Sequence, residues 1–145
     1  MINRPLLFDA SSVFTLVREL RGEAPDLFRE GSTVSLAYYE IGNALWRECF
    51  LLRRIAPEEA SQLLISLFAM LRTMEVAALE DEDLGNAILD LAGRLNITYY
   101  DAAYLTEAQR TNKALVTDDE KLAEAAERIG IKTLTSKTIG HQSRP

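Results

Sequence analysis

Short apolar segments alternate with amphipathic helical segments along almost the whole chain, and this alternation constrains the fold more than any other feature. Stretches with helical spacing of apolar residues separate the segments with strand character. The strand-like segments are 4–8, 33–36, 73–79, 114–117 and 131–134, with a shorter extended piece at 97–100. Strands that alternate with helices are joined by crossover connections and form a mainly parallel sheet. The sequence therefore predicts an α/β fold, a single three-layer domain with helices flanking the sheet.

The chain has 145 residues, which suits one domain with a sizeable core. No apolar stretch is long enough to cross a bilayer, and the first residues run directly into a segment that ends at Asp9, unlike a signal peptide. Cys49 is the single cysteine, so no intramolecular disulfide can form, and we expect a cytoplasmic protein without membrane association. The predicted domain covers residues 1–135, and residues 136–145 are expected to be a loose polar tail.

Local patterns also predict where several helices begin and end. The helical spacing after the second strand continues over 37–54. Thr117 and Glu120 have the spacing of a capping box, which predicts a helix that begins at this point. Gly22 and Gly130 are expected to end two further helices, because glycine favours the position just after a helix.

Acidic residues follow several of the predicted strands, where a helix begins. Asp9 ends the first strand, Glu40 lies one turn into the helix after the second, and Asp101 follows the extended piece. Asp118 and Asp119 follow the next long strand. The carboxyl ends of parallel strands share one edge, and crowded carboxylates raise each other's pKa unless a cation is present. Mg²⁺ and Mn²⁺ prefer oxygen ligands, so the pattern predicts a hard-metal site.

Each acid also has an ordinary structural interpretation. Asp101 could be only the N-cap of its helix, and residues 9–12 could form only a capping turn. Asp118 and Asp119 could merely complement a helix dipole. An agreement across four strand–helix junctions is nevertheless harder to explain by capping than any single match.

The net charge of −6 excludes a dominant basic field of the kind that clamps duplex nucleic acid. A local basic patch is compatible with this charge, and Arg47, Arg53 and Arg54 are candidates for phosphate contacts or for a solvated helix face. Glu40, Asn43 and Arg47 share one helical stripe, which is either a solvated face or part of a site.

Other reactive side chains suggest no catalytic arrangement. His141 is the single histidine and lies in the polar tail, so no Ser-His-Asp or Cys-His arrangement can be built inside the domain. Cys49 is expected to pack within a helix. Trp46, Tyr38 and Tyr39 could stack a nucleobase, although core or dimer packing is the favoured interpretation.

Four segments of the chain resemble the four signature segments of PIN domains, and they look most like those of the VapC toxins of toxin–antitoxin pairs. The segments are Leu-Leu-Phe-Asp-Ala-Ser-Ser-Val (6–13), Tyr-Glu-Ile-Gly-Asn-Ala-Leu (39–45), Tyr-Asp-Ala-Ala-Tyr-Leu (100–105) and Leu-Val-Thr-Asp-Asp-Glu-Lys-Leu (115–122). They occur in the order of the family, and the resemblance spans residues 4–135.

The resemblance implies a five-stranded parallel sheet, one or two Mg²⁺ or Mn²⁺ ions and endoribonuclease activity on RNA. It also implies a homodimer and an inhibitory antitoxin partner. The residues that it assigns as catalytic and metal-binding are Asp9, Glu40, Asp101 and Asp119, and the supporting candidates are Asn43, Thr117, Asp118 and Ser11.

We therefore predict metal-dependent hydrolysis of phosphodiester bonds in single-stranded or loop regions of RNA. Two alternatives stay open: a catalytically inactive PIN-like binding protein, and a receiver-type signalling domain. The wide apolar face of the helix that begins at Pro57, together with Trp46, Phe50 and Leu51, is expected to form a homodimer or to receive an antitoxin segment.

Overall fold

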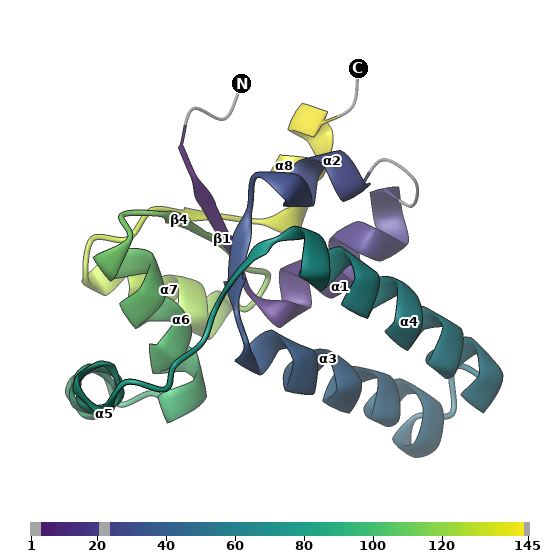
Figure 1. Cartoon of the computed structure of the whole chain (residues 1–145), viewed down its shortest axis with the longest axis horizontal. Helices are drawn as coiled ribbons and strands as arrows, with labels where there is room; N and C mark the ends of the chain where they lie inside the picture. The colour runs from purple at the N-terminus through teal and green to yellow at the C-terminus, as the bar shows by residue number, and fades with distance from the viewer. Residues whose placement is uncertain (1–3, 21–23, 144–145) are drawn as a thin grey trace.

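Five parallel strands form one sheet at the centre of the computed structural model, which describes residues 4–20 and 24–143 (Figure 1). The strands are β1 (Leu6–Phe8), β2 (Ser32–Val34), β3 (Glu75–Ala77), β4 (Ala114–Val116) and β5 (Thr133–Leu134). Their order across the sheet is β3-β2-β1-β4-β5, and every neighbouring pair is parallel. The predicted α/β fold with a five-stranded parallel sheet is confirmed.

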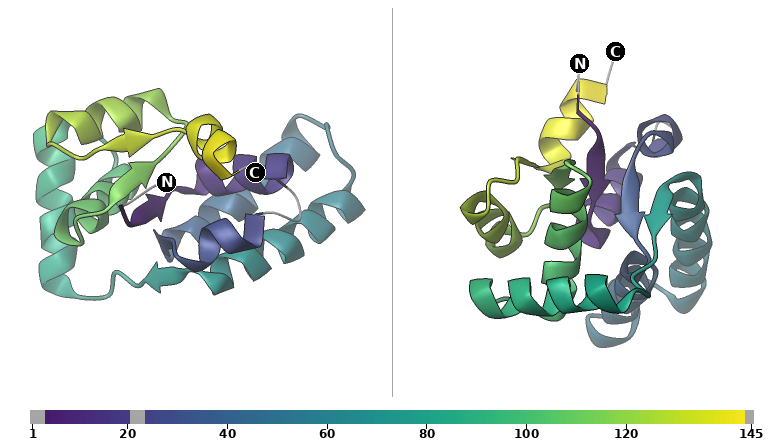
Figure 2. Two further views of the ribbon diagram at one scale, coloured as in Figure 1. Left: turned by 90° about the horizontal axis from the view of Figure 1, so that it is seen from above. Right: turned by 60° about the vertical axis from the view of Figure 1, so that its left-hand side comes forward.

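Helices cover both faces of this sheet, so the molecule has three layers (Figures 1 and 2). The elements of the first face are α1 (Ala10–Leu20), α2 (Ala24–Arg29), α3 (Leu36–Trp46) with its π-helical continuation η2 (Arg47–Leu51), α4 (Pro57–Thr73) and α8 (Ser136–Ser143). Those of the second face are α5 (Glu82–Leu95), α6 (Tyr99–Arg110) and α7 (Glu120–Arg128). Each face has its own apolar cluster against the sheet.

The central strands supply both clusters, because successive side chains of a strand point to opposite faces. Leu6 and Phe8 belong to the cluster on the side of α1, and Leu7 belongs to the cluster on the side of α6. Leu115 lies opposite Leu7 in the register of β4 with β1 and joins the same cluster. Because both faces of the sheet are buried, polar chemistry is left to the ends of the strands.

The strand order places the switch point of the topology between β1 and β4. The chain continues from β1 to β2 on one side, whereas β4 lies on the other side. In open α/β sheets, ligands bind beyond the carboxyl ends of the strands at such a point. The order also differs from the 2-1-3-4-5 order of receiver-type domains, so the receiver-type alternative is wrong.

Two helix limits differ from the sequence prediction. The helix predicted over 37–54 ends at residue 51, and the chain reverses at Arg53, which has a left-handed backbone with φ 52°. The segment 97–100 is not a strand, because Thr98 caps α6 and the helix begins at the next residue.

The predicted capping box before α7 is also wrong. Asp119 is the N-cap, and its side chain accepts hydrogen bonds from two backbone N–H groups of the first turn. Thr117 instead donates its hydroxyl to Asp9 on the neighbouring strand. The end of α7 agrees with the prediction, since Gly130 follows it with φ 79°.

The prediction of a loose polar tail is wrong over residues 136–143, which form α8. Ile139 is fully buried and joins the apolar cluster that includes Leu20 of α1. The Ser136 N–H donates to Asp118 Oδ1 at 2.9 Å and anchors the start of the helix. An apolar contact and a backbone hydrogen bond therefore dock this otherwise polar segment.

Part of the apolar face of α4 packs against the protein's own core, and the prediction that this face forms a homodimer or receives an antitoxin segment stays a prediction. Its buried or partly buried residues are Leu63, Leu64, Leu67, Phe68 and Leu71. The exposed part of the predicted surface lies on α3 and η2 and comprises Trp46, Phe50 and Leu51.

The predictions made for residues 1–3, for Gly22 and for residues 144–145 lie outside the described part of the chain. Within residues 4–20 and 24–143, no helix combines the length and apolar character needed to span a bilayer.

Candidate active site

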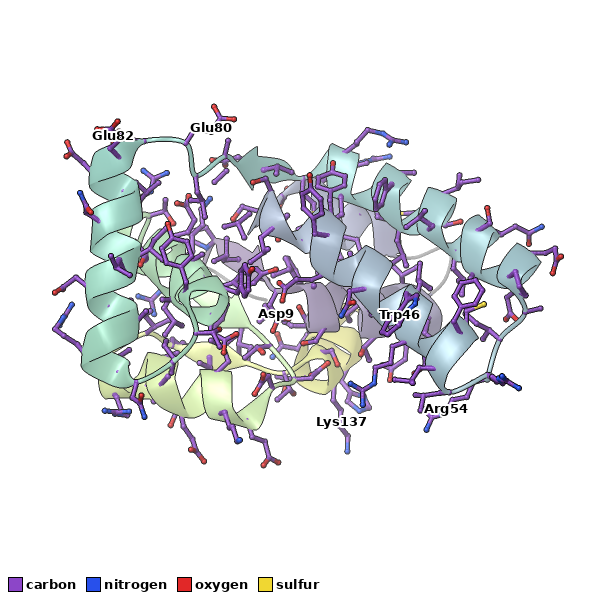
Figure 3. The ribbon with its side chains drawn as sticks, turned by 90° about the horizontal axis from the view of Figure 1, so that it is seen from below. Asp9, Trp46, Arg54, Glu80, Glu82 and Lys137 are labelled. Atoms are coloured by element: carbon purple, nitrogen blue, oxygen red, sulfur yellow. The ribbon has the colours of Figure 1, made fainter. Side chains whose placement is uncertain are left out.

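Asp9 is buried at the carboxyl end of β1, and hydrogen-bond donors surround its carboxylate. Its Oδ1 accepts hydrogen bonds from Ser11 Oγ at 2.9 Å and from the Ser12 N–H at 2.8 Å, and its Oδ2 accepts one from the Thr117 hydroxyl. The bond from Ser12 is the capping contact expected at the start of α1, so Asp9 is a helix cap as well as a candidate site residue. Viewed from below, Asp9 lies near the middle of the molecule, between α3 and the helices of the second face (Figure 3).

Thr117 extends the site from the end of β4. Its Oγ1 accepts a hydrogen bond from the Asp119 N–H at 3.0 Å while its hydroxyl donates to Asp9. Ser12 Oγ lies 2.9 Å from the Val116 carbonyl oxygen and donates to it. These bonds tie the ends of β1 and β4 together at the switch point of the sheet.

Glu40 lies one turn into α3 and contacts α6 through a tyrosine. The Tyr104 hydroxyl donates to Glu40 Oε1 at 2.6 Å, and the tyrosine ring is buried. Tyr104 follows Asp101 by three positions, so both residues lie on one face of α6. Helix α6 therefore brings Asp101 toward the site although no strand precedes it.

Asp101 lies in the first turn of α6 and is not the N-cap. The cap is Thr98, whose Oγ1 accepts a hydrogen bond from the Asp101 N–H at 3.1 Å. The interpretation of Asp101 as only a helix cap is therefore wrong, and its carboxylate is left for other interactions.

The four acids influence one another electrostatically. Burial raises the pKa of Asp9. Burial also raises the pKa of Glu40, the Tyr104 hydroxyl lowers it, and the charges of Asp9 and Asp101 raise it further. Burial and then the charge of Asp119 raise the pKa of Asp101. Each acid thus has another acid as an electrostatic neighbour, an arrangement that favours protons or a cation.

The donor atoms of this site suit a hard divalent cation, because carboxylate and hydroxyl oxygens are preferred ligands of Mg²⁺ and Mn²⁺. Within residues 4–20 and 24–143, no three His, Cys, Asp or Glu side chains gather closely enough to hold a metal ion. Carboxylates without a cation repel one another, which opposes such a gathering. The residues therefore fit the ion in chemistry, and one or two carboxylates together with water molecules would suffice to hold it.

The supporting candidates lie in different surroundings. Ser11 and Thr117 donate their hydroxyl hydrogens to the Asp9 carboxylate. Asn43 lines a pocket beside Glu40. Asp118 is engaged by the Ser136 N–H at the start of α8. Asp118 thus has a backbone partner at α8, whereas the charge of Asp119 acts on Asp101.

Sequence reasoning missed two residues of the site. Tyr104 is buried, as its inward position on α6 predicts, but its hydroxyl also bonds to Glu40. The spacing of three positions from Asp101 was the available signal. Ser12 follows Asp9 by three positions, which is the spacing of a capping bond.

The other singled-out residues divide into packed and exposed groups. Cys49 is buried, which confirms the packing prediction. Tyr38 also packs against the core, whereas Tyr39 and Trp46 are exposed, so core packing is the wrong interpretation for these two. His141 is exposed on α8.

Comparison with known proteins identifies relatives by sequence, although no established family profile matches the chain. The chain is 36% identical over 126 residues to Ribonuclease VapC3 of Pyrobaculum aerophilum, covering 82% of this chain and 92% of that protein. It is 34% identical over 100 residues to Exonuclease VapC9 of the same organism, covering 68% of this chain and 70% of that protein.

A solved structure supports the fold independently. The crystal structure of PAE2754 from Pyrobaculum aerophilum superposes with a TM-score of 0.79 at 21% identity, covering 98% of this chain and 96% of that chain. The likeness extends over the whole three-layer architecture, and the sequence identities with VapC3 and VapC9 extend over most of each chain. This chain therefore belongs to the VapC-type PIN-domain family.

Proposed function

We propose that this chain is a metal-dependent endoribonuclease and the toxin of a toxin–antitoxin pair. The observation that carries the proposal is the hydrogen-bonded arrangement of acids at the carboxyl ends of β1 and β4, where Thr117 links Asp9 to Asp119 and Tyr104 joins Glu40 to the helix of Asp101. The names of two relatives, a ribonuclease and an exonuclease, support nuclease chemistry.

The residues that would hold one or two Mg²⁺ or Mn²⁺ ions are Asp9, Glu40, Asp101 and Asp119. When bound, such ions activate a water molecule and stabilise charge on the phosphate and the leaving oxygen. Thr117 and Ser11 fix the orientation of the Asp9 carboxylate. Tyr104 fixes that of Glu40 in the same way.

We further propose a cognate antitoxin and a second copy of this chain as protein partners, and the cytoplasm as the location. Support for a protein partner comes from the exposed side chains of Trp46, Phe50 and Leu51 on α3 and η2 (Figure 3 shows Trp46). Large apolar groups that gather on a surface mark interaction sites.

A circular single-stranded RNA tests the activity directly, because it has no end from which an exonuclease can start. The purified protein is incubated with this RNA and Mn²⁺, with and without EDTA. We expect the wild-type protein to produce linear fragments with Mn²⁺ and none when EDTA removes the ion. The variant Asp9→Asn should produce almost no linear fragments with Mn²⁺.

Cleavage of linear but not circular RNA would replace the endonuclease by an exonuclease. Equal cleavage with EDTA would contradict the metal requirement. Failure to cleave either RNA would contradict the proposed activity and leave the inactive PIN-like binding protein as the better description.

A further inference from the structure

A pocket of about 690 Å³ lies beside Glu40, between α3 and the start of α6. Its lining residues are Leu36, Tyr39, Glu40, Asn43, Ala44, Arg47 and Tyr100. Most of them recur along α3 at positions of one helical face. Because Glu40 is also a member of the acid group, the pocket shares this residue with the candidate active site.

Two tyrosine rings of this pocket are accessible. Tyr39 on α3 is 80% exposed, and Tyr100 on α6 is 61% exposed. The structure therefore offers aromatic faces that its own core does not use. Stacking of a nucleobase on such a ring is favourable for every base, since each base has a π-face.

A cation lies in the same pocket. None of the ion pairs formed by the described residues involves Arg47, and its side chain is exposed on the acid-facing stripe of α3. A guanidinium without an acidic partner is suited to a phosphate oxygen. Asn43 adds an amide that can donate and accept hydrogen bonds.

We propose that this pocket is a nucleobase subsite for single-stranded RNA, an inference that rests on the proposed ribonuclease function. One base stacks on Tyr39 or Tyr100, Arg47 binds the adjoining phosphate, and the backbone continues past Glu40 to the acids. The lining is mainly apolar, which suits a stacked base, and the Arg47 guanidinium beside Glu40 favours a strand that carries phosphates over an apolar protein segment. Recognition by stacking accepts all four bases, so the pocket positions the strand without specifying its sequence.

The test measures binding apart from cleavage. A fluorescent 12-nucleotide single-stranded RNA is titrated with protein in EDTA at low salt, alongside strands in which one abasic residue moves along the sequence. The variants are Tyr39→Leu/Tyr100→Leu, which removes the rings but keeps apolar bulk, and Tyr39→Phe/Tyr100→Phe, which keeps the rings. Leu89→Ala is the control, because Leu89 is 61% exposed on α5, like Tyr100, but lies outside the pocket.

We expect one abasic position to weaken binding to the wild-type protein by about 5- to 100-fold. The Leu double variant should bind the intact strand as weakly as the abasic one, whereas the Phe variant and Leu89→Ala should behave like wild type. Equal affinities for the intact and abasic strands, or no binding of either, would overturn the subsite.

A dimer that dissociates in the Leu double variant while RNA binding persists would make the pocket an interface between copies instead, which also overturns the subsite. The outcome is separable from that of the proposed function. Base-dependent binding without any cleavage contradicts only the ribonuclease activity, and cleavage without base-dependent binding contradicts only the subsite.

Discussion

Several interactions shift the pKa of Glu40, and they act in opposite directions. Burial and the charges of Asp9 and Asp101 raise its pKa, and the hydrogen bond from Tyr104 lowers it. A donor bound to the charged form favours ionisation. Tyr104 is therefore a positioning residue that orients Glu40 and keeps it available as an anion.

Tyr104→Phe tests this role, because it removes the hydroxyl but keeps the buried ring. We expect the pKa of Glu40 to rise further, since the stabilising donor is lost. A carboxyl-carbon NMR titration of wild type and variant measures it, and the acidic limb of the cleavage rate should move to higher pH. An unchanged Glu40 titration would show that the hydroxyl does not act on this carboxylate.

The raised pKa values of the acids also predict how stability depends on pH. Burial, with like charges, raises the pKa of Glu40 above 4.5 and that of Asp101 above 3.8. Such an acid binds its proton more tightly in the folded chain. Its contribution to stability is thus fully present below the unfolded pKa and is lost as pH rises through the folded pKa.

We therefore expect the free energy of unfolding of the ion-free protein to fall as pH rises from about 4 toward neutrality. The fall should be smaller in Asp101→Asn, because this variant lacks the carboxylate at position 101. Thermal unfolding of both proteins in EDTA over this range checks the prediction. Parallel pH profiles would mean that Asp101 experiences no such electrostatic cost.

At the scale of single elements, the sequence predicted the apolar segments well and their polar ends less well. Strand segments such as 114–117 follow from their own apolar composition. The capping box at Thr117 failed because this hydroxyl bonds to Asp9, which is far away in sequence. Competition between a local cap and a tertiary partner cannot be read from local spacing.

Helix α8 illustrates the same limit, since this mostly polar segment is held by the buried Ile139 side chain and by the hydrogen bond between Ser136 and Asp118. We expect Ile139→Ala to lower the free energy of unfolding by about 2–5 kcal/mol, through lost burial and the remaining cavity. Urea denaturation measures the change. Lys137→Ala is the control on the same helix, because Lys137 projects outward (Figure 3). Equal stability of the two variants would mean that α8 contributes nothing to the core.

At the scale of the whole molecule, the parallel sheet determines which acids meet. The position of Asp9 at the carboxyl end of the parallel strands was predictable, because Asp9 directly follows a strand. Asp101 lies in a helix that no strand directly precedes, so its position depends on the packing of α6. The contact of Asp118 depends in the same way on the packing of α8. These placements arise from contacts between distant elements, which spacing along the chain does not encode.

Mn²⁺ should stabilise the whole fold if the acids bind it. A ligand that binds only the folded state contributes about 2.7 kcal/mol at a hundredfold excess over its Kd, which corresponds to a rise of about 5–10 °C in Tm for a domain of this size. The rise should be smaller in Asp9→Asn and should fade at acidic pH, where protons compete. A flat Tm up to millimolar Mn²⁺ would contradict an avid ion site.

The most direct test of the central claim uses two adjacent aspartates as a matched pair. Asp119 is the electrostatic neighbour of Asp101, whereas Asp118 is bound to the start of α8. Asparagine preserves the capping acceptor at both positions, so each variant loses one charge and little else. The rate of circular-RNA cleavage with Mn²⁺ should fall by about 100-fold or more in Asp119→Asn and stay close to wild type in Asp118→Asn. Equal rates in the two variants, or a greater loss in Asp118→Asn, would contradict the assignment of the active site.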